Sequence, residues 1–230
     1  MGYRLSNDVG HAEGHSVSSS KFQRNFTPTD WPKRALDLLI AIVALIFLSP
    51  LILLMAVLIR LQDGGPAFFT QRRVGKHGEV FHVFKLRSMI IDAEDRLDDL
   101  LARDPEARRE WDETQKLEND PRVTPLGNFI RKSSIDELPQ LLNIIKGEMS
   151  LVGPRPITEV EVPRYTDNFK YYCSVCPGIT GLWQVGGRSD VTYKERVLID
   201  VKYVETQSFW GDLKILILTI PAVLASRGAR

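Results

Sequence analysis

Apolar residues are concentrated in one long run near the start of the chain. Between Leu38 and Leu61 the run is interrupted at Ser49, Pro50 and Arg60. At a rise of about 1.5 Å per residue, a helix of this length reaches across the hydrocarbon core of a bilayer. The pattern therefore predicts a membrane helix over residues 31–61.

The centre of this run carries a helix break. Proline removes an internal hydrogen bond and clashes with the preceding turn, so Ser49-Pro50 predicts a kink. Basic residues stand on both sides of the run, namely Lys33, Arg34 and Arg60, so the charges give the helix no direction across a membrane. A helix that enters, bends and returns would leave both flanks in the cytoplasm. We prefer this re-entrant topology to an ordinary kinked transmembrane helix.

The rest of the chain has shorter periods, which predict a mostly helical α/β domain with little sheet over residues 62–230. Alternating side chains predict a strand at 80–87, and helical spacing recurs at 90–118, 128–132, 138–145 and 191–204. The short apolar stretch from Phe209 to Ala225 predicts either an amphipathic helix in the membrane interface or a helix packed on the core. Residues 1–30 are rich in Ser, Gly, Asn and Thr without an apolar period, which predicts a disordered cytoplasmic tail.

Charge and cysteine content limit the classes of partner. Lys and Arg number 30 against 29 for Asp and Glu, so no overall field attracts nucleic acid, and any recognition of anions must be local. Cys173 and Cys176 have C-x-x-C spacing, but no second pair completes a zinc site and Pro177-Gly178 predicts a turn. We expect a domain in a reducing cytoplasm and no nucleic-acid partner.

Two adjacent acids form the candidate chemical centre. Asp136 and Glu137 follow Arg131 and precede an apolar helical pattern. Acids at a helix start face the positive end of its dipole, which favours their ionised forms. An ionised carboxylate can be a nucleophile toward phosphorus or a ligand for Mg²⁺. Ser134 and Glu137 also match a capping box, in which the side chains only satisfy backbone N–H groups, and both interpretations stay open on these residues alone.

Several basic side chains are candidates to converge on these acids. Lys85 and Arg87 share one face of the predicted strand, where they either bind phosphate or extend to a membrane edge. Arg155 stands between two prolines, and a rigidly displayed guanidinium suits a forked grip on phosphate oxygens. Arg188 follows a glycine-rich segment. Together with Arg131, these groups would hold a diphosphate while its bond breaks, because phosphoryl transfer depends on positioning and charge neutralisation.

Four ordered motifs resemble the bacterial sugar transferase family, the monotopic polyprenyl-phosphate phosphoglycosyl transferases. They are Lys-Leu-Arg-Ser-Met at 85–89, Asp-Glu-Leu-Pro-Gln-Leu-Leu-Asn at 136–143, Gly-Glu-Met-Ser-Leu-Val-Gly-Pro-Arg-Pro at 147–156 and Pro-Gly-Ile-Thr-Gly-Leu-Trp-Gln at 177–184. The resemblance covers about residues 32–228, and it is greatest to rhizobial starters of exopolysaccharide. It implies that a UDP-sugar and undecaprenyl phosphate react to give a sugar-diphospholipid and UMP, on the cytoplasmic face of the bacterial inner membrane.

The resemblance also implies roles for single residues. Asp136 would attack the β-phosphate to form an aspartyl phosphosugar, and Glu137 would hold Mg²⁺. Ser49-Pro50 matches the break that makes the membrane helix re-entrant. Ser189 departs from the family pattern, in which we expect asparagine, and this concerns local sugar contacts. The family positions that line the phosphate and uridine pocket correspond to Lys85, Arg131, Arg155 and Arg188.

The resemblance leaves the sugar and the partners less defined. We expect galactose first and glucose second, with membrane lipids and downstream glycosyltransferases as further partners. A non-catalytic membrane scaffold for polysaccharide assembly is the alternative that would keep the same fold. A conventional inverting glycosyltransferase would release UDP instead of UMP, so the nucleotide product separates these readings.

Overall fold

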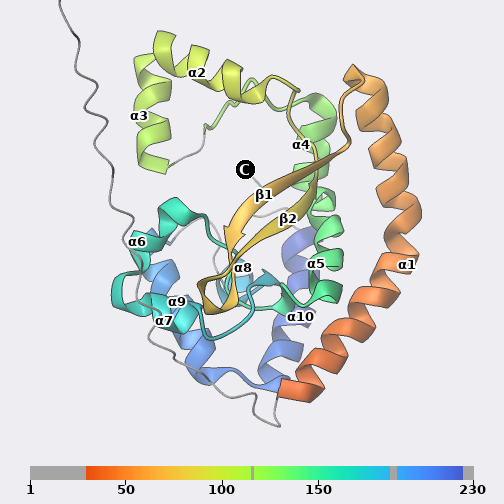
Figure 1. The fold of residues 1–230 in the computed structure, drawn as a ribbon, viewed down its shortest axis with the longest axis vertical. Coiled ribbons are helices and arrows are strands. Elements are labelled where there is room, and N and C mark those ends of the chain that lie inside the picture. The colour runs from red at the N-terminus through yellow and green to blue at the C-terminus, as the bar shows by residue number, and fades with distance from the viewer. Residues whose placement is uncertain (1–29, 115–116, 187–190, 225–230) are drawn as a thin grey trace, which may run out of the picture.

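The computed structural model describes residues 30–114, 117–186 and 191–224. Of the tail predicted over residues 1–30, all but Asp30 lies outside them, and Asp30 is the first residue of α1. The described chain is mostly helical with two small sheets, which confirms the predicted class (Figure 1). The longer elements follow the sequence pattern, with a strand at Val80–Leu86 and a helix at Tyr193–Thr206. The α-helices are α1 (Asp30–Asp63), α2 (Ala93–Arg103), α3 (Pro105–Thr114), α4 (Pro125–Lys132), α5 (Leu141–Lys146), α6 (Val162–Tyr165), α7 (Phe169–Tyr172), α8 (Leu182–Gly186), α9 (Tyr193–Thr206) and α10 (Phe209–Leu224). Short 3-10 helices are η1 (Lys76–Gly78), η2 (Ile135–Gln140), η3 (Glu159–Glu161) and η4 (Thr166–Asn168).

Both sheets are two-stranded. β1 (Phe68–Val74) and β2 (Val80–Leu86) form an antiparallel hairpin whose register sets Phe69 opposite Lys85. β3 (Ser150–Val152) and β4 (Gly178–Thr180) pair in parallel across the segment that carries α6 and α7. In Figure 1, α5 lies between the hairpin and α1, so the acid-bearing segment is enclosed between the sheet and the long helix.

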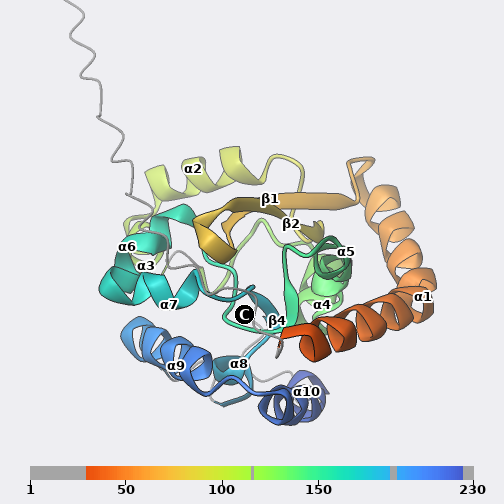
Figure 2. The same cartoon turned by 60° about the horizontal axis from the view of Figure 1, so that its bottom comes forward.

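Helix α1 is continuous through its proline. Pro50 has no N–H, so the carbonyl of Ile46 loses the partner it would have in a regular helix. The hydroxyl of Ser49 donates to that carbonyl at 2.9 Å and restores a hydrogen bond. The helix axis changes direction between its two ends (Figure 2). The serine before the proline therefore supplies a hydrogen-bond donor to the backbone carbonyl that the proline leaves without one.

The two faces of α1 have different surroundings. Ala41, Ile52 and Ile59 are buried against the domain, at most 7% exposed. On the opposite face, Phe47 is 78% and Leu53 62% exposed, although a helix on a water-facing surface carries polar residues there. Among the described residues, α1 is the helix that is long and apolar enough to cross a membrane. Its exposed apolar face would be unfavourable in water, so it indicates contact with an apolar environment.

Charged residues attach the start of α1 to the domain. Asp37 is 5% exposed and its carboxylate accepts from the hydroxyl of Ser150 at 2.7 Å and from the next backbone N–H at 3.1 Å. Lys33 Nζ donates to Asp212 Oδ2 of α10 at 2.6 Å. Arg34 donates to the last carbonyls of α5. Lys33 and Arg34, two of the three cations that flank the apolar run, are therefore fixed by protein contacts.

Candidate active site

The two acids lie in the first turn of η2. Ser134 before them adopts a left-handed conformation with φ of 57° and its side chain makes no cap, so the capping-box interpretation is wrong. A 3-10 helix also accommodates Pro139, because α5 begins only at Leu141 and its hydrogen-bonded turns lie beyond the proline. Glu137 is thus free to turn its carboxylate toward basic side chains from other elements.

Two cations meet one oxygen of Glu137. Lys85 Nζ lies 3.0 Å and Arg155 Nη2 3.3 Å from Glu137 Oε1. Lys85 Nζ also lies 3.8 Å from Asp136 Oδ2, so a single ammonium serves both acids. The second oxygen of Glu137, Oε2, makes no hydrogen bond to the residues that the structure describes. The pair therefore keeps carboxylate oxygens available to a ligand.

The pKa values of these neighbours shift in opposite directions. Burial raises the pKa of Asp136 above its usual value, against the lowering effects of Lys85 and Arg131. Burial also opposes ionisation of Glu137, but Lys85 and Arg155 outweigh it and lower its pKa to about 2. The helix-start argument predicted ionised forms for both acids. Glu137 is ionised, but the cause is its contact with Lys85 and Arg155 and not the helix start. For Asp136 burial raises the pKa, so its ionised form is destabilised, which is frequent for reactive groups.

Lys85 reaches the acids because β2 is fastened to α5. Asn143 is fully buried, and its amide donates to the carbonyl of His82 at 2.7 Å and accepts from the N–H of Phe84 at 3.1 Å. This clamp fixes the backbone directly before Lys85. The strand and the helix were predicted from the sequence, but the clamp was not, because its partners are about 60 positions apart in the chain.

The remaining predicted cations are placed differently. Arg131 Nε donates to Ser88 Oγ at 2.7 Å, and Arg131 lies close enough to Asp136 to affect its pKa. Arg87 instead forms an ion pair with Asp63 at the end of α1, and its side chain is only 8% exposed. Its Nε and Nη1 atoms are buried without a hydrogen-bond partner among the described residues. Arg188 lies outside the described residues, so its predicted role stays a prediction.

A hollow opens beside Glu137. Its wall includes a residue that the sequence did not single out, Arg73 of β1. The strand β1 was not predicted, and only its pairing with β2 shows which of the neighbouring Arg72 and Arg73 turns inward. The lining residues are Arg73, Val83, Lys85, Glu137, Gln140, Arg155, Pro156, Gly178 and Ile179.

Carboxylate oxygens are the donors that this site offers to a metal ion. No group of three or more His, Cys, Asp or Glu side chains gathers in the described part of the chain. Mg²⁺ is commonly held by one or two carboxylates, with substrate phosphates and water as its other ligands. Asp136 and the unbonded oxygen of Glu137 fit that mode, in which the substrate completes the coordination.

Comparison with known proteins identifies the family of this site. The family model described as bacterial sugar transferase matches residues 28–226. The chain belongs to the bacterial sugar transferase family. Residues 85–89 and 136–156, which carry the candidate site, lie within the matched region. The resemblance inferred from the four motifs is therefore confirmed.

Relatives in this family are similar over most of the chain. An exopolysaccharide production protein ExoY from Sinorhizobium fredii is 50% identical over 197 residues, which is 86% of this chain and 87% of that protein. An undecaprenyl-phosphate galactose phosphotransferase from Salmonella typhimurium is 46% identical over 96% of this chain but only 47% of its own length. An undecaprenyl-phosphate glucose phosphotransferase from Komagataeibacter xylinus is 40% identical, over 36% of its length. The chain thus spans half or less of these two phosphotransferases.

Proposed function

We propose that this sugar transferase moves a sugar 1-phosphate from a UDP-sugar to undecaprenyl phosphate and releases UMP. The observation that carries the proposal is the contact of Lys85 and Arg155 with one oxygen of Glu137, beside a buried Asp136. Such a set neutralises phosphate charge and leaves a carboxylate for attack. The names of the Salmonella and Komagataeibacter relatives specify sugar phosphate transfer on undecaprenyl phosphate, which supports the same chemistry here.

The reaction would proceed in two steps through Asp136. A carboxylate oxygen of Asp136 attacks the β-phosphorus, a new phosphorus–oxygen bond forms, and the bond to the bridging oxygen breaks with its electron pair leaving on UMP. An oxygen of undecaprenyl phosphate then attacks the same phosphorus and displaces Asp136 as a carboxylate. Lys85 lowers the pKa of Asp136 and so favours its ionised form against the larger effect of burial, and Arg155 lines the hollow in which the phosphates would lie. Arg131 and Arg188 are further candidates for phosphate contact.

Glu137 is the proposed ligand for Mg²⁺. The pKa of about 2 keeps it ionised at any physiological pH, as a metal ligand requires. A bound Mg²⁺ would neutralise charge on the diphosphate oxygens. Chelation by EDTA should stop UMP release, and Glu137→Gln should weaken Mg²⁺ binding measured by calorimetry. Unchanged Mg²⁺ affinity in this variant would remove Glu137 from the metal site.

The proposed location is the cytoplasmic face of the bacterial inner membrane, with α1 as a re-entrant helix. The exposed apolar face of α1 supports membrane contact, as do Trp210 and Ile220 of α10, which are 75% and 62% exposed. Both ends of α1 contact the same domain, through Lys33 at one end and Asp63 at the other. A helix that spanned the membrane would have to separate these ends, so the contacts support entry and return on one side.

Topology can be tested by labelling. Single cysteines introduced before Lys33 and after Arg60, in a background with Cys173 and Cys176 replaced by serine, should both stay unlabelled by an impermeant reagent in intact cells. A periplasmic control cysteine in another inner-membrane protein verifies the reagent. Labelling at the N-terminal position alone would show a spanning helix.

The activity itself is tested by its products. Purified protein with undecaprenyl phosphate and a panel of UDP-sugars should yield UMP and a sugar-diphospholipid by mass spectrometry, with UDP-galactose expected to react best and UDP-glucose next. Incubation with the UDP-sugar alone should leave a sugar-phosphate adduct on the peptide containing Asp136. Release of UDP would indicate an inverting glycosyltransferase. No nucleotide release with any donor would leave a scaffold for polysaccharide assembly as the function.

A further inference from the structure

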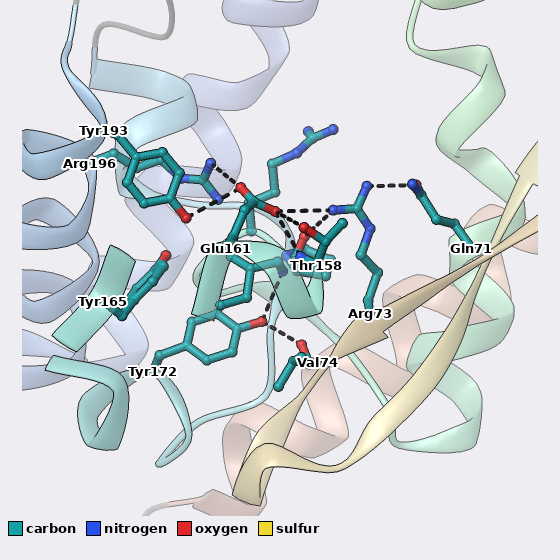
Figure 3. A network of polar contacts seen from close by, with 12 residues as sticks. Gln71, Arg73, Val74, Thr158, Glu161, Tyr165, Tyr172, Tyr193 and Arg196 are labelled. Carbon is teal, nitrogen blue, oxygen red and sulfur yellow. Dashed lines mark hydrogen bonds and ion pairs between the residues drawn. The ribbon is translucent and has the colours of Figure 1, made fainter. Parts of the chain in front are cut away.

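A second cluster of partly buried charged groups, centred on Glu161, adjoins the hollow (Figure 3). One oxygen of Glu161, Oε2, accepts from the backbone N–H of Thr158 at 2.7 Å and from its hydroxyl at 2.9 Å. The other, Oε1, accepts from Tyr193 at 3.3 Å and from Arg196 at 3.5 Å. Both oxygens are therefore occupied, and they join η3 to α9.

Arg73 belongs to this cluster and to the hollow at the same time. Its side chain is 15% exposed, and its Nη1 lies 3.5 Å from Glu161 Oε2. Figure 3 shows its guanidinium between Glu161 and Gln71, to which Nη2 donates at 2.6 Å. Nη1 also donates to the carbonyl of Pro156 at 3.2 Å. These partners do not use every N–H of a guanidinium, so Arg73 retains donors while its orientation is fixed.

The groups around Arg73 carry more positive than negative charge, which favours the binding of an anion. Arg73 and Arg155 both line the hollow, and burial together with Arg155 lowers the pKa of Arg73. Glu161 offsets only part of this positive charge, because it is shared with Arg196. The guanidinium groups of Arg73, 15% exposed, and Arg155, 36% exposed, repel each other, and an anion bound in the hollow would reduce the repulsion.

We propose that Arg73 is a further phosphate-binding residue of the hollow and that Glu161 is the residue that positions it. The ligand class is a phosphate group, supplied either by a nucleoside diphosphate or by a polyprenyl phosphate. Through the carbonyl of Pro156, Arg73 also holds the residue next to Arg155, so the two guanidinium groups are fixed relative to each other before a ligand arrives. Such preorganisation raises affinity because little ordering remains to be done on binding. The identity of the ligand rests on the proposed function, whereas the presence of a phosphate site does not.

The chain provides a matched control for Arg73. Arg72, its neighbour in β1, forms an ion pair with Glu159 at 2.9 Å, and both side chains are more than half exposed. Arg72→Gln and Glu159→Gln therefore remove the same chemical groups from the same strand and the same 3-10 helix, outside the hollow. We expect neither change to affect ligand binding.

The direct test measures binding of UDP, UMP and uridine by calorimetry. Arg73→Gln should weaken UDP binding by about 10- to 100-fold, the range for loss of a hydrogen bond to a charged group, and leave uridine binding unchanged. Arg73→Lys keeps the positive charge but loses the two-pronged hydrogen bonding of a guanidinium, so its UDP affinity should lie between those of Arg73→Gln and the unmodified protein. It also provides a second variant in case Arg73→Gln misfolds. KM values for the UDP-sugar and for a short polyprenyl phosphate show which phosphate is contacted.

Glu161 has a distinct expected signature. Glu161→Gln should raise the KM of the substrate whose phosphate Arg73 binds by several-fold with a smaller change in kcat, and Glu161→Asp should recover part of the loss. A merely structural role would lower Tm and affect UDP and uridine binding equally. That equal effect would overturn the positioning role.

Two results would overturn the assignment of Arg73. One is unchanged affinity for both UDP and polyprenyl phosphate in folded Arg73→Gln protein. The other is failure of the unmodified protein to bind either compound. If the unmodified protein binds UDP but releases no UMP from any UDP-sugar, the proposed reaction fails while the comparison of Arg73 with Arg72 still decides the phosphate site.

Discussion

Glu137 and Glu161 stand on either side of the segment that carries Arg155, and each meets two cations. Glu161 uses both of its oxygens, with four donors from η3 and α9. Glu137 receives Lys85 and Arg155 on one oxygen and leaves the other open. The two glutamates have the same charge and similar side-chain exposure, 19% and 21%. They differ in the number of occupied oxygens, which supports the proposal that Glu137 binds a ligand while Glu161 positions its neighbours.

Each of the two clusters also contains an aspartate. Near Arg196, Asp200 accepts a hydrogen bond from Tyr165 at 2.7 Å, and burial raises its pKa to about 6. Near Glu137, Asp136 lies 3.8 Å from Lys85, and burial raises its pKa as well. A raised pKa is therefore common to both aspartates, and Asp136 differs from Asp200 in its position beside Lys85 and Glu137.

The largest expected effect is that of Asp136→Asn on activity. Without a nucleophilic carboxylate, UMP release should fall by at least about 10³-fold. Thermal stability should stay equal or rise, because burial penalises the charge that the change removes. UMP assays and melting curves on the same preparation check both parts. Retained UMP release would end the distinction drawn between Asp136 and Asp200.

The next effect is the stability cost of Glu137→Gln. The pKa of Glu137 is lowered from 4.5 to about 2, which corresponds to roughly 3 kcal/mol of stability at pH 7. Because the folded-state pKa is the lower one, this contribution is present above pH 4.5 and is lost as the pH falls toward 2. Urea unfolding at pH 7 and at pH 3 should show a large difference between variant and unmodified protein that shrinks at the lower pH. Equal stability at pH 7 would contradict the assignment.

A smaller change is expected in the pH profile when Lys85 is replaced by methionine. Lys85 is the main charge that lowers the pKa of Asp136, so its removal raises that pKa further. In the proposed reaction Asp136 acts as a carboxylate, so the acid limb of kcat/KM should move to higher pH. Lys202→Met on exposed α9 is the control and should leave the limb in place. An unmoved limb in Lys85→Met would show that another group sets it.

The smallest effect on activity is expected for Asp200→Asn. Burial raises the pKa of Asp200 from 3.8 to about 6, so its ionised form costs stability at pH 7, and this cost falls as the pH decreases through 6. Asparagine keeps an acceptor for Tyr165 without the charge, so the free energy of unfolding at pH 7 should stay equal or rise, by at most about 3 kcal/mol. UMP release should be unaffected. A loss like that of Asp136→Asn would place Asp200 in the reaction.

Sequence reasoning succeeded where the signal is local or carried by a family motif. The apolar run gave α1, and the motifs gave Asp136, Glu137, Lys85 and Arg155, which the structure brings together. Sequence reasoning also placed Lys85 and Arg87 on one face of the strand, with both as candidate phosphate-binding residues. In the structure Arg87 forms an ion pair with Asp63 and does not line the hollow.

What sequence reasoning missed depends on contacts between distant segments. Arg73 is recognised as part of the hollow only from strand pairing, and Glu161 only from side chains contributed by β1, η3 and α9. The left-handed conformation of Ser134 was not predicted, because Ser134 and Glu137 have the spacing of a capping box although they do not form one. Local sequence patterns specify which helices and strands form. Which charged side chains then contact one another depends on how these elements pack.

The buried carboxylate of Asp37 has a practical consequence for anyone preparing a water-soluble form of this enzyme. Cutting the chain after α1 would remove Asp37, so the backbone N–H of Leu151 would lose its acceptor and the Ser150 hydroxyl would keep only the carbonyl of Val152. Asp212 would lose its ion pair with Lys33. The truncated protein would therefore have unsatisfied polar groups at β3. Detergent or nanodisc samples of the intact chain are therefore the proper starting material.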